Sequence, residues 1–240
     1  MEVKNNLLNY KDKYIYQNTD WFMFSLDSVL LANFVSVKIS DKIIVDLAAG
    51  NAPVAMLLSF RTDAHIYGVE LQKEIYDLGV KSVKINNLEQ KITLFYMDIK
   101  DCRTKFDNES VDVVVCNPPY FKTSSDKHLN NDNIKTIARH EVKFSLDMLF
   151  DNACYILKNK GVFAMVHRPE RLTEIIFKML EYGIEPKRIQ FSYPKNGKMA
   201  NSVLIEGVKN GNKGLKVLSP IIAHKDDGTY SDEIRKMFGS

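Results

Sequence analysis

Short apolar runs alternate along this chain with longer segments of helical periodicity, and this alternation limits the possible folds more than any other feature. Apolar runs of about four to eight residues indicate strands, and amphipathic segments of about ten or more residues indicate helices. The segment 42–50 is predicted to be a strand that ends in an Ala-Ala-Gly turn. We predict further strands at 65–70, 92–98, 110–117, 160–167, 188–194 and 201–208, and helices at 54–60, 73–87, 145–157 and 169–183. Strands that alternate with helices form an open α/β sheet.

The predicted sheet is mostly parallel and has seven strands. The run SVDVVVCN at 110–117 is nearly continuous in apolar residues, which is typical of a parallel strand covered by helices on both faces. The last two predicted strands have no helix between them, so we expect an antiparallel hairpin at the C-terminal end of the sheet.

The chain is predicted to form a single domain over its 240 residues. We expect an N-terminal helical extension at 1–40, a core at 41–183, and a basic C-terminal hairpin and tail at 184–240. The sequence lacks a signal-peptide pattern and a long uninterrupted apolar stretch, which predicts a cytoplasmic protein without a membrane anchor. Three cysteines and five histidines without ligand spacing predict neither a disulfide framework nor a bound metal.

Basic residues are concentrated near the C-terminus, although the formal net charge of the whole chain is only +3. Residues 186–225 contain a single acid, Glu206, and eight basic residues: Lys187, Arg188, Lys195, Lys198, Lys209, Lys213, Lys216 and Lys225. A solvated face explains many such runs. A polyanionic partner is the alternative, because clustered cations gain from phosphate counterion release. The candidate contacts are Lys187, Arg188, Lys195 and Lys198.

A hydrogen-bonding side chain lies at the end of each of the first four predicted strands. These residues are Asp46, Glu70, Asp98 and Asn117. Ligands of open α/β sheets bind at the carboxyl ends of the strands, so we expect the four side chains to share one site. Glu70 suits the two hydroxyls of a ribose and Asp98 suits an adenine amino group. Each acid taken alone is more simply explained as a helix N-cap or a turn residue, but the four together favour a shared site.

The turn after the first strand, DLAAGNA, has one glycine, Gly50. It is not the G-x-G-x-x-G of a dinucleotide-binding turn, and the sequence also has no phosphate loop ending in G-K-[ST]. These absences argue against NAD and ATP. A nucleoside cofactor without phosphates, such as S-adenosylmethionine, remains compatible with the turn.

The stretch VVVCNPPYFK, residues 113–122, joins a strand to a turn that cannot continue it. Pro118 and Pro119 remove backbone donors and hold the chain extended, which frees the Pro118 carbonyl from sheet pairing. The carboxamide of Asn117 and that carbonyl could together accept both hydrogens of an exocyclic amine, while Tyr120 stacks on the ring that carries it. A rigid turn is the simpler interpretation of Asn-Pro-Pro alone, but its place at the end of the fourth strand, followed by Tyr120 and Phe121, favours the functional interpretation.

At this point the sequence resembles the bacterial tRNA1(Val) (adenine(37)-N6)-methyltransferases, which have a Rossmann-like class I methyltransferase fold. Asn117-Pro118-Pro119-Tyr120 is similar to the catalytic signature of methyltransferases that act on amino groups beside a π-system. The resemblance covers most of the chain and includes FSLDSVLLANFV (24–35), VDLAAGNAPVAMLLSFRT (45–62), GVELQ (68–72), CNPPYFK (116–122), ARHE (138–141), HRPERL (167–172) and GKMANSVLIEGVKNGNKGLKVLSPI (197–221).

The resemblance implies methyl transfer from S-adenosylmethionine to N6 of an adenine beside the anticodon of a tRNA. It assigns the target base to Asn117, Pro118, Pro119 and Tyr120. The cofactor residues that it implies are Phe24, Asp27, Asp46, Ala48, Gly50, Glu70, Leu71, Asp98, Ile99 and Asn117. Phe24 and Asp27 are equally typical of a helix start.

Two residues depart from the family pattern, and the sequence leaves their effect open. The role of one further segment is open as well. Ala48 and Ala52 stand where glycine is common, and the methyl group of Ala52 could crowd the methionine moiety of the cofactor. Arg139, His140 and Glu141 could order the loop after Tyr120 or contact RNA, although a plain helix start is the simpler interpretation.

Two other functions remain open from the sequence. A glutamine-N5 protein methyltransferase would use the same Asn-Pro-Pro-Tyr signature, but it would have no evident need for a basic C-terminal hairpin. A catalytically silent RNA-binding module would keep the fold without the reaction. The oligomeric state is open as well.

Overall fold

A computed structural model describes residues 1–20, 24–118 and 145–239. Its strands are β1 Glu2–Asn6, β2 Tyr14–Asn18, β3 Ile43–Leu47, β4 His65–Glu70, β5 Ile92–Tyr96, β6 Val111–Cys116, β7 Leu157–His167, β8 Ile184–Tyr193, β9 Ser202–Lys209, β10 Lys216–Val217 and β11 Ile221–Ile222. Its helices are α1 Leu26–Phe34, α2 Pro53–Ser59, α3 Lys73–Ile85, α5 Leu146–Ile156, α6 Leu172–Glu181 and α7 Asp232–Met237, with short 3-10 turns η1 Ile99–Thr104 and η2 Pro169–Arg171.

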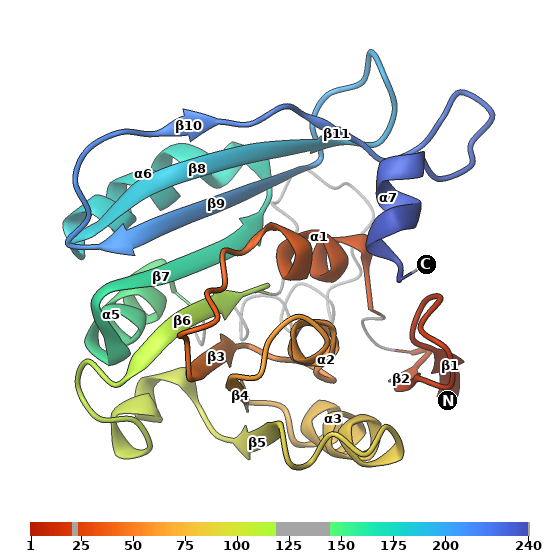
Figure 1. Ribbon diagram of the computed structural model, residues 1–240, viewed down its shortest axis with the longest axis horizontal. Helices are drawn as coiled ribbons and strands as arrows, with labels where there is room; N and C mark the ends of the chain where they lie inside the picture. Colours follow the sequence, from red (N-terminus) through yellow and green to blue (C-terminus); the bar gives the residue numbers. More distant parts are fainter. Residues whose placement is uncertain (21–23, 119–144, 240) are drawn as a thin grey trace, which may run out of the picture.

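The main sheet has the strand order β10-β8-β9-β7-β6-β3-β4-β5, with β11 also paired to β8 (Figure 1). Strands β5, β4, β3, β6 and β7 are parallel, and β9 runs antiparallel between β7 and β8. The predicted α/β fold with seven long strands and a C-terminal antiparallel hairpin is therefore confirmed. Two strands of two residues each, β10 and β11, extend the sheet beyond β8.

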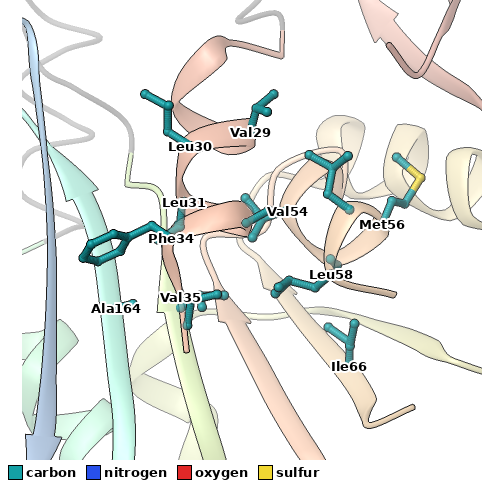
Figure 2. Close-up of a cluster of buried hydrophobic side chains, with 14 of the residues drawn as sticks. Val29, Leu30, Leu31, Phe34, Val35, Val54, Met56, Leu58, Ile66 and Ala164 are labelled. Carbon is teal, nitrogen blue, oxygen red and sulfur yellow. The ribbon is translucent and has the colours of Figure 1, made fainter. Parts of the chain in front are cut away.

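Helices cover both faces of the sheet, as the apolar strands require (Figure 1). Helices α1 and α2 pack on one face, where Phe34 lies beside Ala164 of β7 and Leu58 lies above Ile66 of β4 (Figure 2). Helices α5 and α6 pack on the other face, around Phe150 and Phe163, whose ring centroids are 5.0 Å apart. Each face thus has its own buried apolar layer.

The first twenty residues differ from the predicted helical extension, which is wrong for residues 2–18. Strands β1 and β2 form a small antiparallel sheet that packs against α3. The alternation of YIYQN explains this outcome, because Ile15 and Gln17 are buried while the tyrosines on either side of Ile15 are half-buried. The backbone amides of Tyr14 and Tyr16 donate to Asn86 and Ser82, 66 or more residues away. Helix begins only at Leu26.

None of the described helices is long and apolar enough to cross a membrane. The single-domain division of the chain stays a prediction.

Candidate active site

A cavity lies at the carboxyl ends of β3, β4 and β6, where strand order reverses between β3 and β6. Of the residues singled out from the sequence, it is lined by Phe24, Asp46, Ala48, Gly50, Glu70, Leu71, Asp98, Ile99, Asn117 and Pro118. Its position agrees with the general rule that ligands of open α/β sheets bind at such a switch point.

Strand alternation turns the polar side chains toward one face of the sheet. Ile44 of β3 belongs to the apolar layer under α1 and α2, so Asp46, two residues later, faces the same side. In β6, Val113 and Val115 belong to that layer, and the next residue in the series is Asn117. Pairing of β6 with its neighbours ends at Cys116, so the predicted break before the prolines is present.

Asp46 is fully buried at the end of β3, and neither carboxylate oxygen has a hydrogen-bond partner of ordinary geometry within the part of the chain that the structure describes. Burial raises the pKa of Asp46 to about 8, the nearby carboxylate of Glu70 adds to the shift, and the Ala55 backbone opposes it only weakly. A buried polar group without a partner is costly, so it indicates a place where a ligand supplies the missing contact.

Glu70 closes β4 and holds the turn that follows β3. Its Oε2 accepts the Gly50 N–H at 2.9 Å and its Oε1 accepts the Gln72 N–H at 2.8 Å. The side chain is 7% exposed and lines the cavity, and burial raises its pKa. The Leu71 backbone and the Gln72 side chain also act on this carboxylate and oppose the rise of its pKa, so Glu70 is held by the turn that follows β4 as well.

The turn Ala48–Ala52 carries unusual backbone angles. Gly50 has a φ of +60°, and an added Cβ there would meet no atom within 4 Å, so the backbone faces open space. Ala48 and Ala52 also have positive φ, +61° and +69°, a conformation that costs an alanine about 1 kcal/mol. Ala48 lines the cavity, whereas the methyl group of Ala52 packs in the apolar layer under α1 and α2. Ala52 therefore does not point at the cofactor region.

Gly68 of β4 lets this turn approach the sheet closely. A Cβ at Gly68 would lie 2.9 Å from the Cβ of Ala49 and 2.5 Å from a methyl carbon of Leu94. Only a residue without a side chain fits beneath the turn.

Asp98 is an N-cap that also lines the cavity, so its position is compatible with both interpretations that the sequence allowed. Its Oδ1 accepts the Lys100 N–H at 3.1 Å, so it caps the first turn of η1. The side chain is also 16% exposed and lines the cavity beside Ile99. A capping carboxylate keeps further acceptor positions, so the two roles are compatible.

Asn117 is held by a residue that the sequence analysis did not identify. Its Nδ2 donates to Ser28 Oγ of α1 at 3.0 Å, and Ser28 is 1% exposed. Met148 of α5 and Asn51 of the turn also line the cavity without having been predicted. A signal for Ser28 existed in FSLDS, where it follows the singled-out Asp27, but nothing local indicates a partner 89 residues away.

Phe24 and Asp27 have different roles. Phe24 lines the cavity, and its N–H donates to Gln17 Oε1 at 2.7 Å. Asp27 is not among the residues that line the cavity, and its Oδ1 accepts a hydrogen bond from Ser202 Oγ at 2.6 Å. Asp27 ties α1 to β9, so the structure indicates an indirect role in the site.

The basic residues of the C-terminal stretch 186–225 fall into two groups, one with contacts inside the protein and one nearer the surface. Arg188 donates to both oxygens of the buried Glu206 and to the Phe34 carbonyl, and Lys209 is 8% exposed and bonded to the Cys154 and Leu157 carbonyls. Arg188 and Lys209 therefore make their contacts inside the protein.

Lys187 donates to the Asn212 carbonyl, near the start of β8. Lys195 and Lys198 lie between β8 and β9, and Lys198 is exposed. Because β9 is antiparallel to both β7 and β8, β8 runs in the direction of β7. The loop between β8 and β9 therefore emerges at the same end of the sheet as Asn117 (Figure 1).

Three predicted site residues, Pro119, Tyr120 and Arg139, lie outside the described residues, as do His140 and Glu141. In the described ranges, no group of three or more His, Cys, Asp or Glu side chains is placed to hold a metal ion.

The described residues fit a nucleoside cofactor that carries a positive charge. The unpartnered carboxylate of Asp46 suits a cationic group, the open space over Gly50 admits a close ligand, and Glu70 and Asp98 offer acceptors to hydroxyl and amino groups. Two buried carboxylates make the cavity unsuitable for phosphates, as the glycine-poor turn also indicated.

Several known proteins with similar sequences carry the same name. A tRNA1(Val) (adenine(37)-N6)-methyltransferase from Phocaeicola vulgatus is 26% identical over 204 residues, which are 85% of this chain and 84% of the relative. Its namesake from Cytophaga hutchinsonii is 25% identical over 203 residues, with 84% of this chain and 83% of the relative covered. These matches confirm the resemblance seen in the sequence.

A solved structure confirms the fold. A predicted O-methyltransferase from Agrobacterium tumefaciens superposes with a TM-score of 0.71 at 19% identity, over 88% of this chain and 95% of that one. The family model of the methyltransferase small domain matches residues 24–179, well over half of the chain. This chain therefore belongs to the methyltransferase small domain family.

Proposed function

We propose that the protein transfers a methyl group from S-adenosylmethionine to N6 of an adenine in tRNA, with adenine 37 of tRNA1(Val) as the specific target. The observation that carries the proposal is Asn117-Pro118 at the end of β6, opening into a cavity lined by Asp46, Glu70 and Asp98. The printed names of the similar proteins support tRNA as the substrate.

Each acid has a task in cofactor binding. Glu70 would accept hydrogen bonds from the two ribose hydroxyls, and Asp98 from the adenine amino group of the cofactor. Asp46 and the backbone at Gly50 would hold the methionine portion, where a cation favours the charged form of the buried carboxylate. When bound, the cofactor supplies a methyl group on a positively charged sulfur.

Asn117 and Pro118 would align the amine that receives the methyl group. The Asn117 carboxamide oxygen and the Pro118 carbonyl accept its two hydrogens and direct the nitrogen lone pair toward the cofactor. The same acceptors relieve the positive charge that grows on the amine, and proximity supplies much of the acceleration.

A cysteine nucleophile has no place in this reaction. Cys116 is fully buried on the opposite face of the sheet, and burial raises the pKa of its thiol well above the usual range. Thiols without a thiolate fraction are poor nucleophiles. A strong general base is also unnecessary, because the methylated amine loses its proton readily once it is cationic.

The loop between β8 and β9 would contact the tRNA backbone near the anticodon. Lys195 and Lys198 lie on it, at the end of the sheet that bears Asn117, and Met199 beside them is 87% exposed. The target adenine would be splayed out of the anticodon loop, where Tyr120 stacks on it. A tRNA substrate supports the expected cytoplasmic location.

Mass spectrometry of tRNA nucleosides tests the proposal. Purified protein is incubated with S-adenosylmethionine and unmodified tRNA1(Val) transcripts that carry either adenine or guanine at position 37. We expect N6-methyladenosine only in the first transcript. Labelled methyl groups in a release factor instead of tRNA would establish the glutamine-N5 alternative. If calorimetry detects no saturable binding of S-adenosylmethionine, the catalytically silent RNA-binding module is the function that fits.

A further inference from the structure

Ser28 connects α1 to the catalytic strand end. The hydrogen bond from Asn117 Nδ2 to Ser28 Oγ is 3.0 Å long and joins residues 89 positions apart in the sequence. Ser28 is 1% exposed and lines the cavity. We propose that Ser28 is a positioning residue, which orients the Asn117 carboxamide for methyl transfer. This inference rests on the proposed function, because it assumes that Asn117 grips the target amine.

The two ends of a carboxamide have opposite chemistry. The oxygen accepts hydrogen bonds and the NH2 group donates them, and a turn of about 180° at the end of the side chain exchanges the two. The target amine carries two N–H groups, so it needs the oxygen of Asn117. Nδ2 is bound to Ser28 on the α1 side. Oδ1, the other terminal atom of the carboxamide, therefore lies on the side away from Ser28 Oγ. The hydrogen bond to Ser28 Oγ thereby helps to hold the observed orientation, in which Oδ1 can accept from an amine.

The helix that carries Ser28 is anchored on both sides. Ser202 Oγ of β9 donates to Asp27 Oδ1 at 2.6 Å, and Ser202 is 1% exposed. On the other side, the Phe24 N–H donates to Oε1 of Gln17, which is 6% exposed. A buried hydroxyl on a helix start held in this way has little freedom to move. This gives Asp27 a reason to be needed although it does not line the cavity.

A purely structural role predicts something different. If Ser28 only satisfied a buried amide, its loss would lower the stability of the protein and weaken cofactor binding together. An orienting role lowers the turnover number while the cofactor still binds, because the misplaced group acts in the chemical step.

The test begins with Ser28→Ala, which removes the acceptor without adding bulk. We expect the turnover number on tRNA1(Val) transcript to fall about tenfold, because misalignment of a reacting group has effects of this size. The dissociation constant of S-adenosylmethionine, measured by calorimetry, should stay within about twofold. Ser25→Ala is the matched control, because Ser25 Oγ is also buried near the start of α1 but has no hydrogen-bond partner among the described residues. It should turn over like the wild type.

A double-mutant cycle then asks whether Ser28 acts through Asn117. Single-turnover rates are measured by nucleoside mass spectrometry for Asn117→Ala with and without Ser28→Ala. We expect Ser28→Ala to cause no further loss in that background, because the amide that it orients is gone. Additive losses, an unchanged turnover number for Ser28→Ala, or parallel loss of cofactor binding would each overturn the inference. A wild-type protein inactive on tRNA would instead refute the proposed function, and this inference with it.

Discussion

Arg188 and Glu206 form a bidentate ion pair inside the sheet, with the Arg188 Nε 2.8 Å from Oε1 and the Nη2 2.9 Å from Oε2 of Glu206. Glu206 is 4% exposed and also accepts from the backbone and hydroxyl of Ser36. The Arg188 guanidinium donates to the Phe34 carbonyl as well. The pair therefore fastens β8 and β9 to the segment after α1.

Glu206→Gln should lower the free energy of unfolding by about 2 kcal/mol, because it leaves the Arg188 guanidinium without its counter-charge, and the 29% exposure of that side chain keeps the loss below that of a fully buried pair. Urea denaturation measures the loss. The matched control is Glu174→Gln, which breaks the exposed pair between Glu174 and Arg171 and should cost less than about 0.5 kcal/mol. Equal effects of the two substitutions would contradict a structural role for the buried pair.

Asp46 makes the stability of the cofactor-free protein depend on pH. The pKa of this buried carboxyl is about 8 in the folded protein, against 3.8 as its ordinary value. Between these values the folded state holds a proton that the unfolded chain has lost, so the contribution of Asp46 is fully present below the lower pKa. It is lost as the pH rises through the upper one.

Relative to Asp46→Asn, we expect the wild-type free energy of unfolding to fall by up to about 1.4 kcal/mol for each pH unit between the two pKa values. Urea denaturation of both proteins at pH 5, 6 and 7 measures the difference. Parallel stability curves for the two proteins would show that Asp46 is ionised in the folded state.

Asn117→Ala should lower the turnover number by about 10²-fold or more, on the scale seen for removal of a positioned polar group. The remaining acids of the cavity should keep the dissociation constant of S-adenosylmethionine within about fivefold, which calorimetry measures and which also shows that the variant is folded. Wild-type turnover in this variant would refute the proposed grip on the amine.

Lys195→Gln combined with Lys198→Gln should weaken tRNA binding and flatten its salt dependence. Loss of two phosphate contacts should reduce the slope of log K against log salt by about 1.5, because each contact releases less than one counterion. Filter binding at several salt concentrations measures the slope, and cofactor affinity should not change.

The matched control for these lysines is Lys81→Gln with Lys84→Gln. Both residues are exposed on α3, which packs beside β5 at the other edge of the sheet (Figure 1). This pair should keep the wild-type slope. The same reduction in both double variants would indicate a general effect of net charge.

Many element bounds could be predicted from the sequence, because local alternation determines them. The predicted strand at 65–70 is β4, and the strand predicted at 110–117 is β6, Val111–Cys116. Polar residues that close successive parallel strands meet at one edge by geometry alone. For that reason the sequence was enough to group Asp46, Glu70, Asp98 and Asn117, and all four line the same cavity.

The predictions that failed or missed a residue concern contacts between distant segments. The β1–β2 hairpin depends on packing against α3, and the tyrosine-rich strand β2 carries little local sign of that partner. A count of charges cannot distinguish Lys198 at the surface from Arg188 in a buried pair.

The sequence by itself determined the alternation of strands and helices from β3 to β9, the acids that close successive parallel strands and the rigid Asn-Pro-Pro end of β6. These follow from side-chain alternation and from backbone restrictions that act within a few residues. Only the tertiary structure decided that Ser28 binds Asn117, that Asp27 is tied to Ser202, and that the basic stretch is divided between interior and surface. The contacts of Ser28 and Asp27 join segments 89 and 175 residues apart, so they form only when packing of the whole sheet brings the segments together. Arg188 and Glu206 face each other across the β8–β9 hairpin, and burial of Glu206 under the segment after α1 decides the role of this pair.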